Sequence, residues 1–126
     1  MSGNLALLLD THILAWVASG GKRLTASLMN QLALEPLFVS AVIAFEYEDL
    51  RLRGRFDDDV PLATLQDDLG FDLLDFPAKL SAEAAALPPI HRDPVDRMLV
   101  AHAMSTGMTL VTADGNIHKY AVPCIA

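Results

Sequence analysis

The stretch "PVDRMLVAHAMSTGMTLVTAD" (residues 94–114) joins a helix pattern to a strand pattern and ends on a carboxylate. A helix is predicted over residues 94–107, because proline suits a first helical turn and glycine suits a helix end. One stripe recurs at helical spacing between them: Val95, Met98, Leu99 and His102. The apolar run at 108–112 then predicts a short buried strand. A helix that leads into such a strand is typical of a parallel sheet.

The same alternation extends over the rest of the chain. Further strands are predicted at residues 5–9, 36–40, 71–76 and 121–125, and further helices at 11–19, 25–34, 41–54, 61–70 and 79–87. The predicted fold class is α/β, with a mainly parallel central sheet and helices on both faces. We expect one domain over residues 1–126, because no repeat, low-complexity segment or linker interrupts the pattern.

Composition excludes several classes of protein. Hydrophobic residues make up 52% of the sequence, which argues against a disordered chain. No apolar run reaches the roughly 18–20 residues that a membrane-spanning helix needs. The start, "MSGNLALLLD", lacks the positive charge of a secretory signal, and one cysteine, Cys124, excludes an internal disulfide. We therefore expect a cytoplasmic protein with no membrane partner.

The net charge of −7 bears on nucleic-acid binding. Sixteen acids against nine bases make a poor surface for holding nucleic acid by general electrostatics. The same charge is compatible with an enzyme that clusters acids around divalent cations, because the metals reverse the local sign.

Five carboxylates stand where a parallel sheet places its functional sites. Asp10 and Asp114 each follow a predicted strand. Because the carboxyl ends of parallel strands meet at one edge of the sheet, we expect these two side chains there. Asp93 and Asp96 open the helix at 94–107, and Glu46 lies inside an apolar helix, so all three can reach the same crevice.

A purely structural role is the alternative for most of these acids. Asp10, Asp93 and Asp114 can cap the helices that follow them, since aspartate is a favoured N-cap residue. Asp96 can complete a capping pair with Asp93. Glu46 has the weakest explanation of this kind, because it lies too far along its helix to contribute to the cap.

Together the acids indicate metal chemistry. Carboxylates gathered in one crevice repel each other, so cations are needed to keep them all ionised. Mg²⁺ or Mn²⁺ suits clustered oxygen ligands, can polarise a phosphoryl oxygen and can activate water for in-line attack. Hydrolysis of a phosphodiester is the reaction that most needs this set.

Four stretches of the chain resemble the PIN domain: "LLLDTHILAW" (7–16), "VSAVIAFE" (39–46), "HRDPVDRMLVAHA" (91–103) and "LVTADGNIHKY" (110–120). The most similar group is the VapC-type toxin ribonucleases of bacterial type II toxin–antitoxin pairs. The resemblance implies a three-layer α/β/α sandwich and Mg²⁺- or Mn²⁺-dependent endoribonuclease activity that leaves 5′-phosphate and 3′-hydroxyl ends. It also implies an RNA substrate, an antitoxin that covers the active site, and in many members a homodimer.

The resemblance also implies roles for individual residues. The family's metal-binding carboxylates correspond here to Asp10, Glu46, Asp96 and Asp114. Asp93 corresponds to a supporting residue or an additional ligand, and Thr11 and Thr112 resemble the hydroxyl residues that flank the metals. The chain departs from its relatives at Glu48 and Asp49, which add negative charge after the second acid.

Some basic and aromatic residues allow two readings. The arginines that are candidates for phosphate contacts are Arg51, Arg53, Arg55, Arg92 and Arg97. Arg97 is preferred among them because it adjoins Asp96, although solvated helix ends and surface ion pairs are the alternative. His12 is close enough to Asp10 to approach a substrate. His102 is expected in the core or at an interface, and Trp16 in the core or at a dimer or partner contact.

Three functions remain open at this point. The preferred one is a metal-dependent endoribonuclease that acts as a toxin. The second is a catalytically silent PIN-fold module that binds an antitoxin or RNA. The third is a phosphatase that forms an aspartyl phosphate, which is weaker because "DTHIL" lacks a second aspartate two positions after Asp10.

Overall fold

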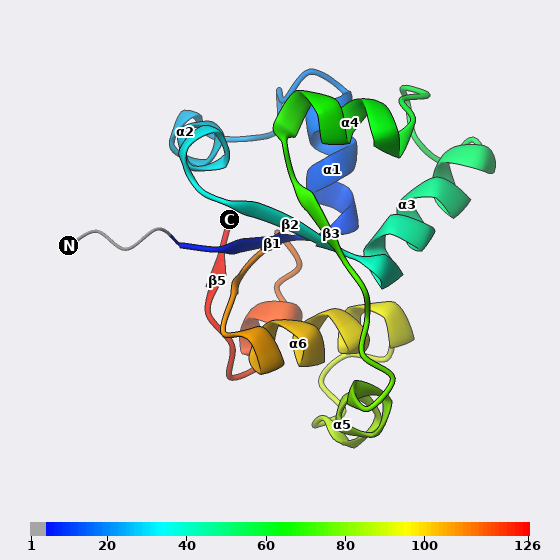
Figure 1. Ribbon diagram of the computed structural model, residues 1–126, viewed down its shortest axis with the longest axis vertical. Coiled ribbons are helices and arrows are strands. Elements are labelled where there is room, and N and C mark those ends of the chain that lie inside the picture. The colour runs from blue at the N-terminus through cyan, green and yellow to red at the C-terminus, as the bar shows by residue number, and fades with distance from the viewer. Residues whose placement is uncertain (1–4) are drawn as a thin grey trace.

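A sheet of five strands runs through the part of the chain that the structure describes (Figure 1). This computed structural model describes residues 5–126. Residues 1–4 lie outside the described part, and they include the start of the predicted domain and of the segment that was compared with a secretory signal. The strands are β1 (Leu7–Leu9), β2 (Leu37–Ser40), β3 (Asp72–Leu74), β4 (Thr109–Val111) and β5 (Cys124–Ile125). They pair in the order β3-β2-β1-β4-β5, and all four pairings are parallel.

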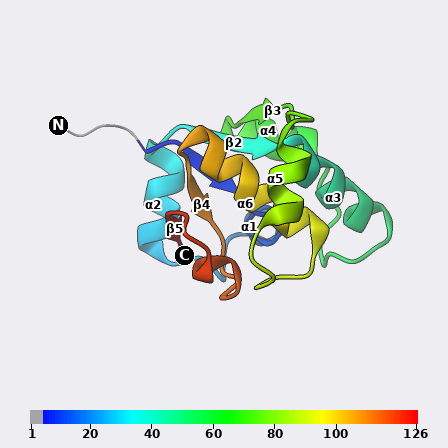
Figure 2. The same cartoon turned by 90° about the horizontal axis from the view of Figure 1, so that it is seen from below.

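Six helices accompany the sheet within residues 5–126: α1 (Thr11–Ala18), α2 (Ala26–Leu34), α3 (Ala41–Leu52), α4 (Leu62–Leu69), α5 (Leu80–Ala86) and α6 (Pro94–Thr106). Figure 1 shows α1, α2 and α4 on one face of the sheet and α6 on the other, and Figure 2 shows α5 beside α6, against which it packs. α3 contacts both α1 and α6. The predicted α/β sandwich with a parallel sheet is confirmed, and the single domain over 1–126 stays a prediction.

The centre of the core is β1. Leu8 pairs with Phe38 of β2 on one side and with Leu110 of β4 on the other. The three leucines of β1 are fully buried. A strand that is covered on both faces gains from apolar residues at every position, which explains the unbroken run "LLL". None of the helices within residues 5–126 has the length and apolar character to cross a membrane.

Local signals fix where the helices begin and end. Asp10, Ser40 and Asp93 precede α1, α3 and α6, and each side chain accepts a nearby backbone N–H. Gly107 adopts a left-handed conformation (φ 72°), which ends α6 and directs the chain into β4. Strong caps at these positions explain why most helix bounds agree with the predictions within one or two residues.

Four of the five strands are at least two residues shorter than predicted. β1 has three residues where 5–9 was predicted, and β4 has three where 108–112 was predicted. β3 has three residues where 71–76 was predicted, and β5 has two where 121–125 was predicted. Each edge strand pairs on one side only, so ladder hydrogen bonds end where the single neighbour ends. A short 3-10 helix (Ile117–Lys119), which the sequence pattern did not indicate, follows β4.

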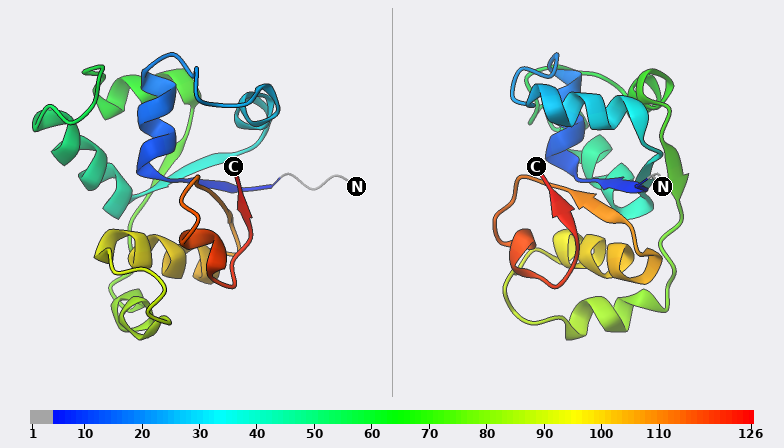
Figure 3. Two further views of the ribbon diagram at one scale, coloured as in Figure 1. Left: turned by 180° about the vertical axis from the view of Figure 1, so that it is seen from behind. Right: turned by 90° about the vertical axis from the view of Figure 1, so that its left-hand side faces the viewer.

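The strand order creates a crevice between β1 and β4. The chain moves outward from β1 to β2 and β3, and then crosses back to β4 and β5 on the other side of β1. The connections after β1 and β4 therefore diverge at the carboxyl ends of these neighbouring strands. Open parallel sheets bind ligands at this kind of switch point. The views from behind and from the side show both connections at the same edge of the sheet (Figure 3).

Candidate metal centre

Five carboxylates line one cleft of about 570 Å³ at the switch point: Asp10, Glu46, Asp93, Asp96 and Asp114. Asp10 follows β1 and Asp114 follows β4, whereas Asp93 and Asp96 come from the start of α6 and Glu46 from the middle of α3. Four separate segments of the chain therefore bring their acids to one place. The structure places all five carboxylates that were predicted to share a crevice along one cleft. Within residues 5–126, Asp96 and Asp114 are the two of them that, with His91, have ligand atoms within 4.8 Å of one another.

Asp10 is buried in this cleft and both of its side-chain oxygens are hydrogen-bonded. Its side chain is 5% exposed, and its two oxygens accept hydrogen bonds at 2.6 Å, one from the Thr11 N–H and one from the Thr112 hydroxyl. Thr112 also accepts a hydrogen bond from the Asp114 N–H at 3.1 Å. Burial raises the pKa of Asp10, and the hydrogen bonds from Thr112 and Thr11 offset part of that rise.

Glu46 faces the same cleft from α3. Its Oε1 accepts a hydrogen bond from the Thr11 hydroxyl at 2.5 Å, which ties α3 to the start of α1. Burial raises the pKa of Glu46, and the negative charges of Asp93 and Asp10 raise it further. The carboxylate that follows the apolar first turns of α3 thus has a hydroxyl partner, and it faces further acids across the cleft.

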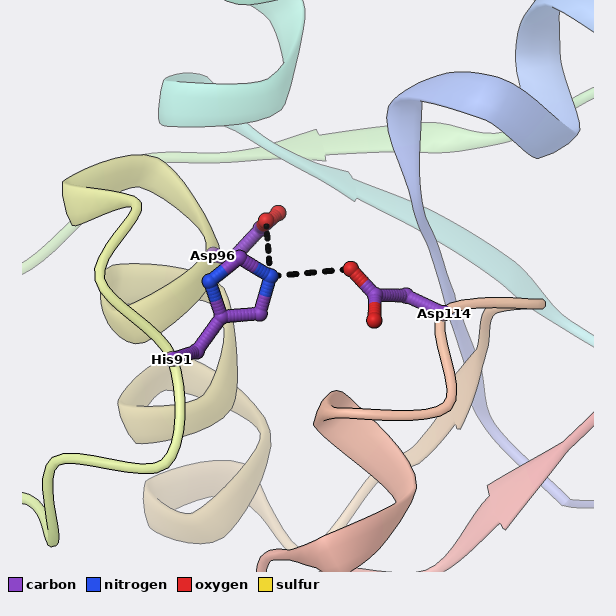
Figure 4. A group of neighbouring side chains, drawn as sticks. All are labelled: His91, Asp96 and Asp114. Carbon is purple, nitrogen blue, oxygen red and sulfur yellow. Dashed lines mark hydrogen bonds and ion pairs between the residues drawn. The ribbon is translucent and has the colours of Figure 1, made fainter.

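His91 lies between the remaining two acids (Figure 4). Its Nε2 lies 2.9 Å from Asp96 Oδ2 and 2.8 Å from Asp114 Oδ2. Its Nδ1 accepts a hydrogen bond from the Asp93 N–H at 3.1 Å. This pattern fits a neutral imidazole that carries its proton on Nε2 and shares it between two carboxylates.

The two acids beside His91 differ in their ionisation. Burial raises the pKa of Asp96 to about 7, with further increases from the charges of Asp10 and Asp93. Partial burial also acts against ionised Asp114, but hydrogen bonds from His91 and the Asn116 N–H outweigh it and lower its pKa. Partial burial by itself lowers the pKa of His91. The neighbouring carboxylates of Asp114 and Asp96 outweigh this effect, so the pKa of His91 is raised overall.

Asp93 combines a structural contact with an electrostatic effect. Its Oδ1 caps α6 by accepting the N–H groups of Val95 and Asp96, at 2.8 and 3.3 Å. Its charge contributes to the raised pKa of both Asp96 and Glu46. The capping role and the place in the cleft are therefore compatible, since one oxygen makes both cap contacts.

The residues of the cleft fit a divalent cation. One ligand atom from each of His91, Asp96 and Asp114 lies within 4.8 Å of the others, and the two carboxylates can bind a cation while His91 Nε2 keeps its proton and orients them. Asp10, Glu46 and Asp96 all have raised pKa values, so the protein without added positive charge opposes their ionisation. Clustered carboxylate oxygens are the ligands that hard divalent ions prefer, and such an ion would favour the ionised forms.

The family model of the PIN domain matches residues 7–123. This chain belongs to the PIN domain family. The resemblance seen in the sequence is confirmed at the level of the family. A comparison with curated protein sequences gave no match.

Solved structures of similar fold support the assignment of this PIN domain. VapC20 of Mycobacterium tuberculosis, described as a sarcin-ricin loop cleaving toxin, is 18% identical with a TM-score of 0.70, over 92% of this chain and 95% of that one. VapBC2 of Rickettsia felis, bound to a promoter DNA fragment, is 16% identical with a TM-score of 0.68, over 96% and 98%. A toxin–antitoxin complex from Klebsiella pneumoniae is 16% identical with a TM-score of 0.65, over 95% and 96%. At these identities, the likeness shows the fold.

Arg97 is engaged inside this PIN domain. Its two terminal nitrogens donate hydrogen bonds to four backbone carbonyls: Ala85, Leu87, Pro88 and His91. These contacts hold the segment that carries His91 against the first turns of α6. Arg97 does not line the acidic cleft, whereas His12 does. Contact of Arg97 with phosphate stays a prediction, and its observed contacts are structural.

His91 is the site residue that sequence reasoning did not single out. His91 precedes α6, so it has no helical spacing of the kind that marks metal ligands on one helix. The available signal was the string "HRDPVD", in which a residue just before a capped helix can fold over its first turn. His102, expected in the core or at an interface, is buried, and its Nδ1 lies 2.9 Å from Ser40 Oγ.

Proposed function

We propose that this PIN domain is a metal-dependent endoribonuclease that acts as the toxin of a type II, VapC-type toxin–antitoxin pair. The observation that carries the proposal is the cleft at the switch point, where four chain segments place five carboxylates. The raised pKa values of Asp10, Glu46 and Asp96 support a site that works with a cation. The fold shared with VapC20, a toxin that cleaves the sarcin-ricin loop, supports RNA as the substrate.

In the proposed reaction, Asp10, Glu46, Asp96 and Asp114 would hold Mg²⁺ or Mn²⁺, with Asp93 as an additional ligand. The cation supplies neutralisation of phosphate charge and activation of water for attack on phosphorus. Thr112 and Thr11 fix the carboxylates of Asp10 and Glu46 by hydrogen bonds, so that the ligand oxygens keep their positions.

Three further residues complete the proposed site: two position the acids or their segment, and one contacts the substrate. His91 orients Asp96 and Asp114 through its Nε2. Arg97 holds the segment before His91 in place. His12 is exposed at the edge of the cleft and is the residue we propose to contact the RNA there.

The proposed role also specifies partners. A toxin of this type requires an antitoxin, and the similar structures include a toxin–antitoxin complex. The net charge of −7 suits a basic segment of such an antitoxin. A homodimer and a location in the bacterial cytoplasm, where RNA is present, belong to the same proposal.

The test is cleavage of a labelled mixed-sequence RNA by the purified protein without its antitoxin. We expect cleavage in Mg²⁺ or Mn²⁺, none in EDTA, and none for Asp10→Asn with an unchanged circular dichroism spectrum. Asp68→Asn, which removes an exposed acid of α4, is the matched control and should cleave like the wild type. Unchanged turnover in Asp10→Asn would refute the assignment.

A catalytically silent binding module is the second candidate. It would bind RNA or an antitoxin and leave the RNA intact at every metal concentration. The complete set of carboxylates argues against it, because like charges in a half-buried cleft destabilise the fold and are retained only where they are used.

A further inference from the structure

A second cleft of about 620 Å³ adjoins the acidic one. The two clefts share three lining residues: His12, Trp16 and Leu50. His12 and Trp16 lie on α1 and Leu50 lies on α3, two helices that pack against each other (Figure 1). The two hollows are therefore parts of one groove that leads away from the candidate metal centre.

The second cleft has a different charge from the first. Lys22, Arg23 and Arg55 line it and are exposed. Within residues 5–126, no side-chain nitrogen of these three residues forms an ion pair with a carboxylate oxygen, whereas Arg51 and Arg53 pair with acids of their own segment. Three of the chain's nine lysines and arginines thus gather, without an ion-pair partner, beside the acidic centre of a protein whose net charge is −7.

Trp16 gives this cleft an aromatic wall. The indole is half-buried on α1, and the Arg23 guanidinium lies over it, 5.9 Å from the ring centroid. An aromatic ring beside cations is the usual combination for single-stranded nucleic acid, because bases stack on the ring while the cations contact phosphates. Trp16 is also the only tryptophan of the sequence.

We propose that this basic cleft, defined by Trp16, Lys22, Arg23 and Arg55, binds a nucleotide of single-stranded RNA next to the scissile phosphate. The base stacks on Trp16 in the place of the exposed Arg23 guanidinium, which moves aside to contact a backbone phosphate together with Arg55 and Lys22. This inference rests on the proposed ribonuclease function and specifies where its substrate lies. The groove continues from the acidic centre, so one strand can reach both parts.

Two acids limit the positive charge of the cleft. Asp57 and Asp58 also line it, so its lysines and arginines outnumber its carboxylates by one. The acids make the proposal testable in both directions. Removing a cation should weaken RNA binding, and removing Asp57 or Asp58 should strengthen it, because repulsion of the phosphates is lost.

The first experiment measures Trp16 fluorescence during titration with a 12-nucleotide mixed-sequence RNA. Ca²⁺ replaces Mg²⁺ so that the acids are neutralised, and a gel checks that the RNA stays intact. We expect quenching by RNA, because a base stacks on the indole. Polyphosphate, which carries charge without bases, should bind without comparable quenching. Equal quenching by polyphosphate, or none by bound RNA, would overturn the stacking contact.

The second experiment measures binding of end-labelled RNA by fluorescence anisotropy at several salt concentrations. Trp16→Leu should weaken binding roughly 5- to 150-fold, and Trp16→Phe should restore most of it, because a ring is kept. Arg23→Gln and Arg55→Gln should each lower the slope of log affinity against log salt by about 0.7. Lys79→Gln, an exposed cation of the α5 start outside both clefts, is the control and should leave Kd unchanged.

The outcomes separate this inference from the proposed function. If the protein cleaves RNA and the Trp16, Arg23 and Arg55 variants bind RNA as tightly as the wild type, the subsite is overturned and the ribonuclease function still stands. The cleft would then be free for a protein segment. RNA binding that depends on these residues, in a protein that cleaves nothing, would support the subsite and refute the ribonuclease.

Discussion

Replacing Asp96 by asparagine should stabilise the metal-free protein at pH 8. The pKa of Asp96 rises from the ordinary value of 3.8 to about 7, chiefly because the folded protein buries the carboxylate near Asp10 and Asp93. The folded protein therefore holds this proton more tightly than the unfolded chain does. Its stability falls as the pH rises between these two values, because folding then requires an ionised carboxylate in an unfavourable place.

The size of the effect follows from the same two values. Each pKa unit corresponds to ~1.36 kcal/mol, so the rise corresponds to ~4 kcal/mol at full ionisation. Local relaxation and water will reduce this, and we expect Asp96→Asn to gain ~2–4 kcal/mol, or ~8–16 °C in Tm for a chain of this size. The asparagine oxygen can still accept the hydrogen bond from His91 Nε2 that Asp96 Oδ2 accepts at 2.9 Å.

The assay is urea denaturation in EDTA from pH 4 to pH 8, for the wild type, Asp96→Asn and the control Asp68→Asn. The gain should be absent near pH 4, grow up to about pH 7 and then stay level. Added Mn²⁺ should stabilise the wild type more than Asp96→Asn, because the ion favours the ionised carboxylate. A variant that is no more stable than the wild type at pH 8, or equally stabilised at pH 4 and pH 8, would refute the reasoning.

Two further predictions concern the contacts around the acids. Thr112→Val keeps the shape of the side chain but removes two hydrogen bonds, the one donated to Asp10 and the one accepted from the Asp114 N–H. Urea denaturation should show a loss of ~1.5–3 kcal/mol, and the part due to Asp10 should be greatest where Asp10 is ionised. An equal loss at acidic and neutral pH would contradict the role given to the bond to Asp10. The lysine in Arg97→Lys cannot reach all four backbone carbonyls, so the free energy of unfolding should fall by ~1–3 kcal/mol. Calorimetry should also show weaker Mn²⁺ binding, because the segment that carries His91 is held less firmly. The control Arg92→Lys should change neither quantity.

Much of the fold was predictable because its signals are local. The caps at Ser40 and Asp93 and the glycine stop at Gly107 act within one helical turn, so the sequence around them is sufficient to place α3 and α6. The apolar runs of β1 and β4 are likewise visible without a structure. The edge strands β3 and β5 were less exact, because their lengths depend on a single neighbour.

The site was predictable only in part, because its contacts join distant segments. A sequence pattern can place Asp10 and Asp114 after strands, but the hydrogen bond between Asp10 and Thr112 spans 102 residues and depends on β1 lying beside β4. His91 reaches Asp114 across 23 residues, without any periodic spacing to indicate it. The sequence thus determined which acids were available and which elements carry them. The tertiary structure decided that His91 lies between Asp96 and Asp114, that Arg97 binds backbone carbonyls, and that Trp16 lines both clefts. These contacts depend on strand order and helix packing, which set the distances between segments far apart in the sequence.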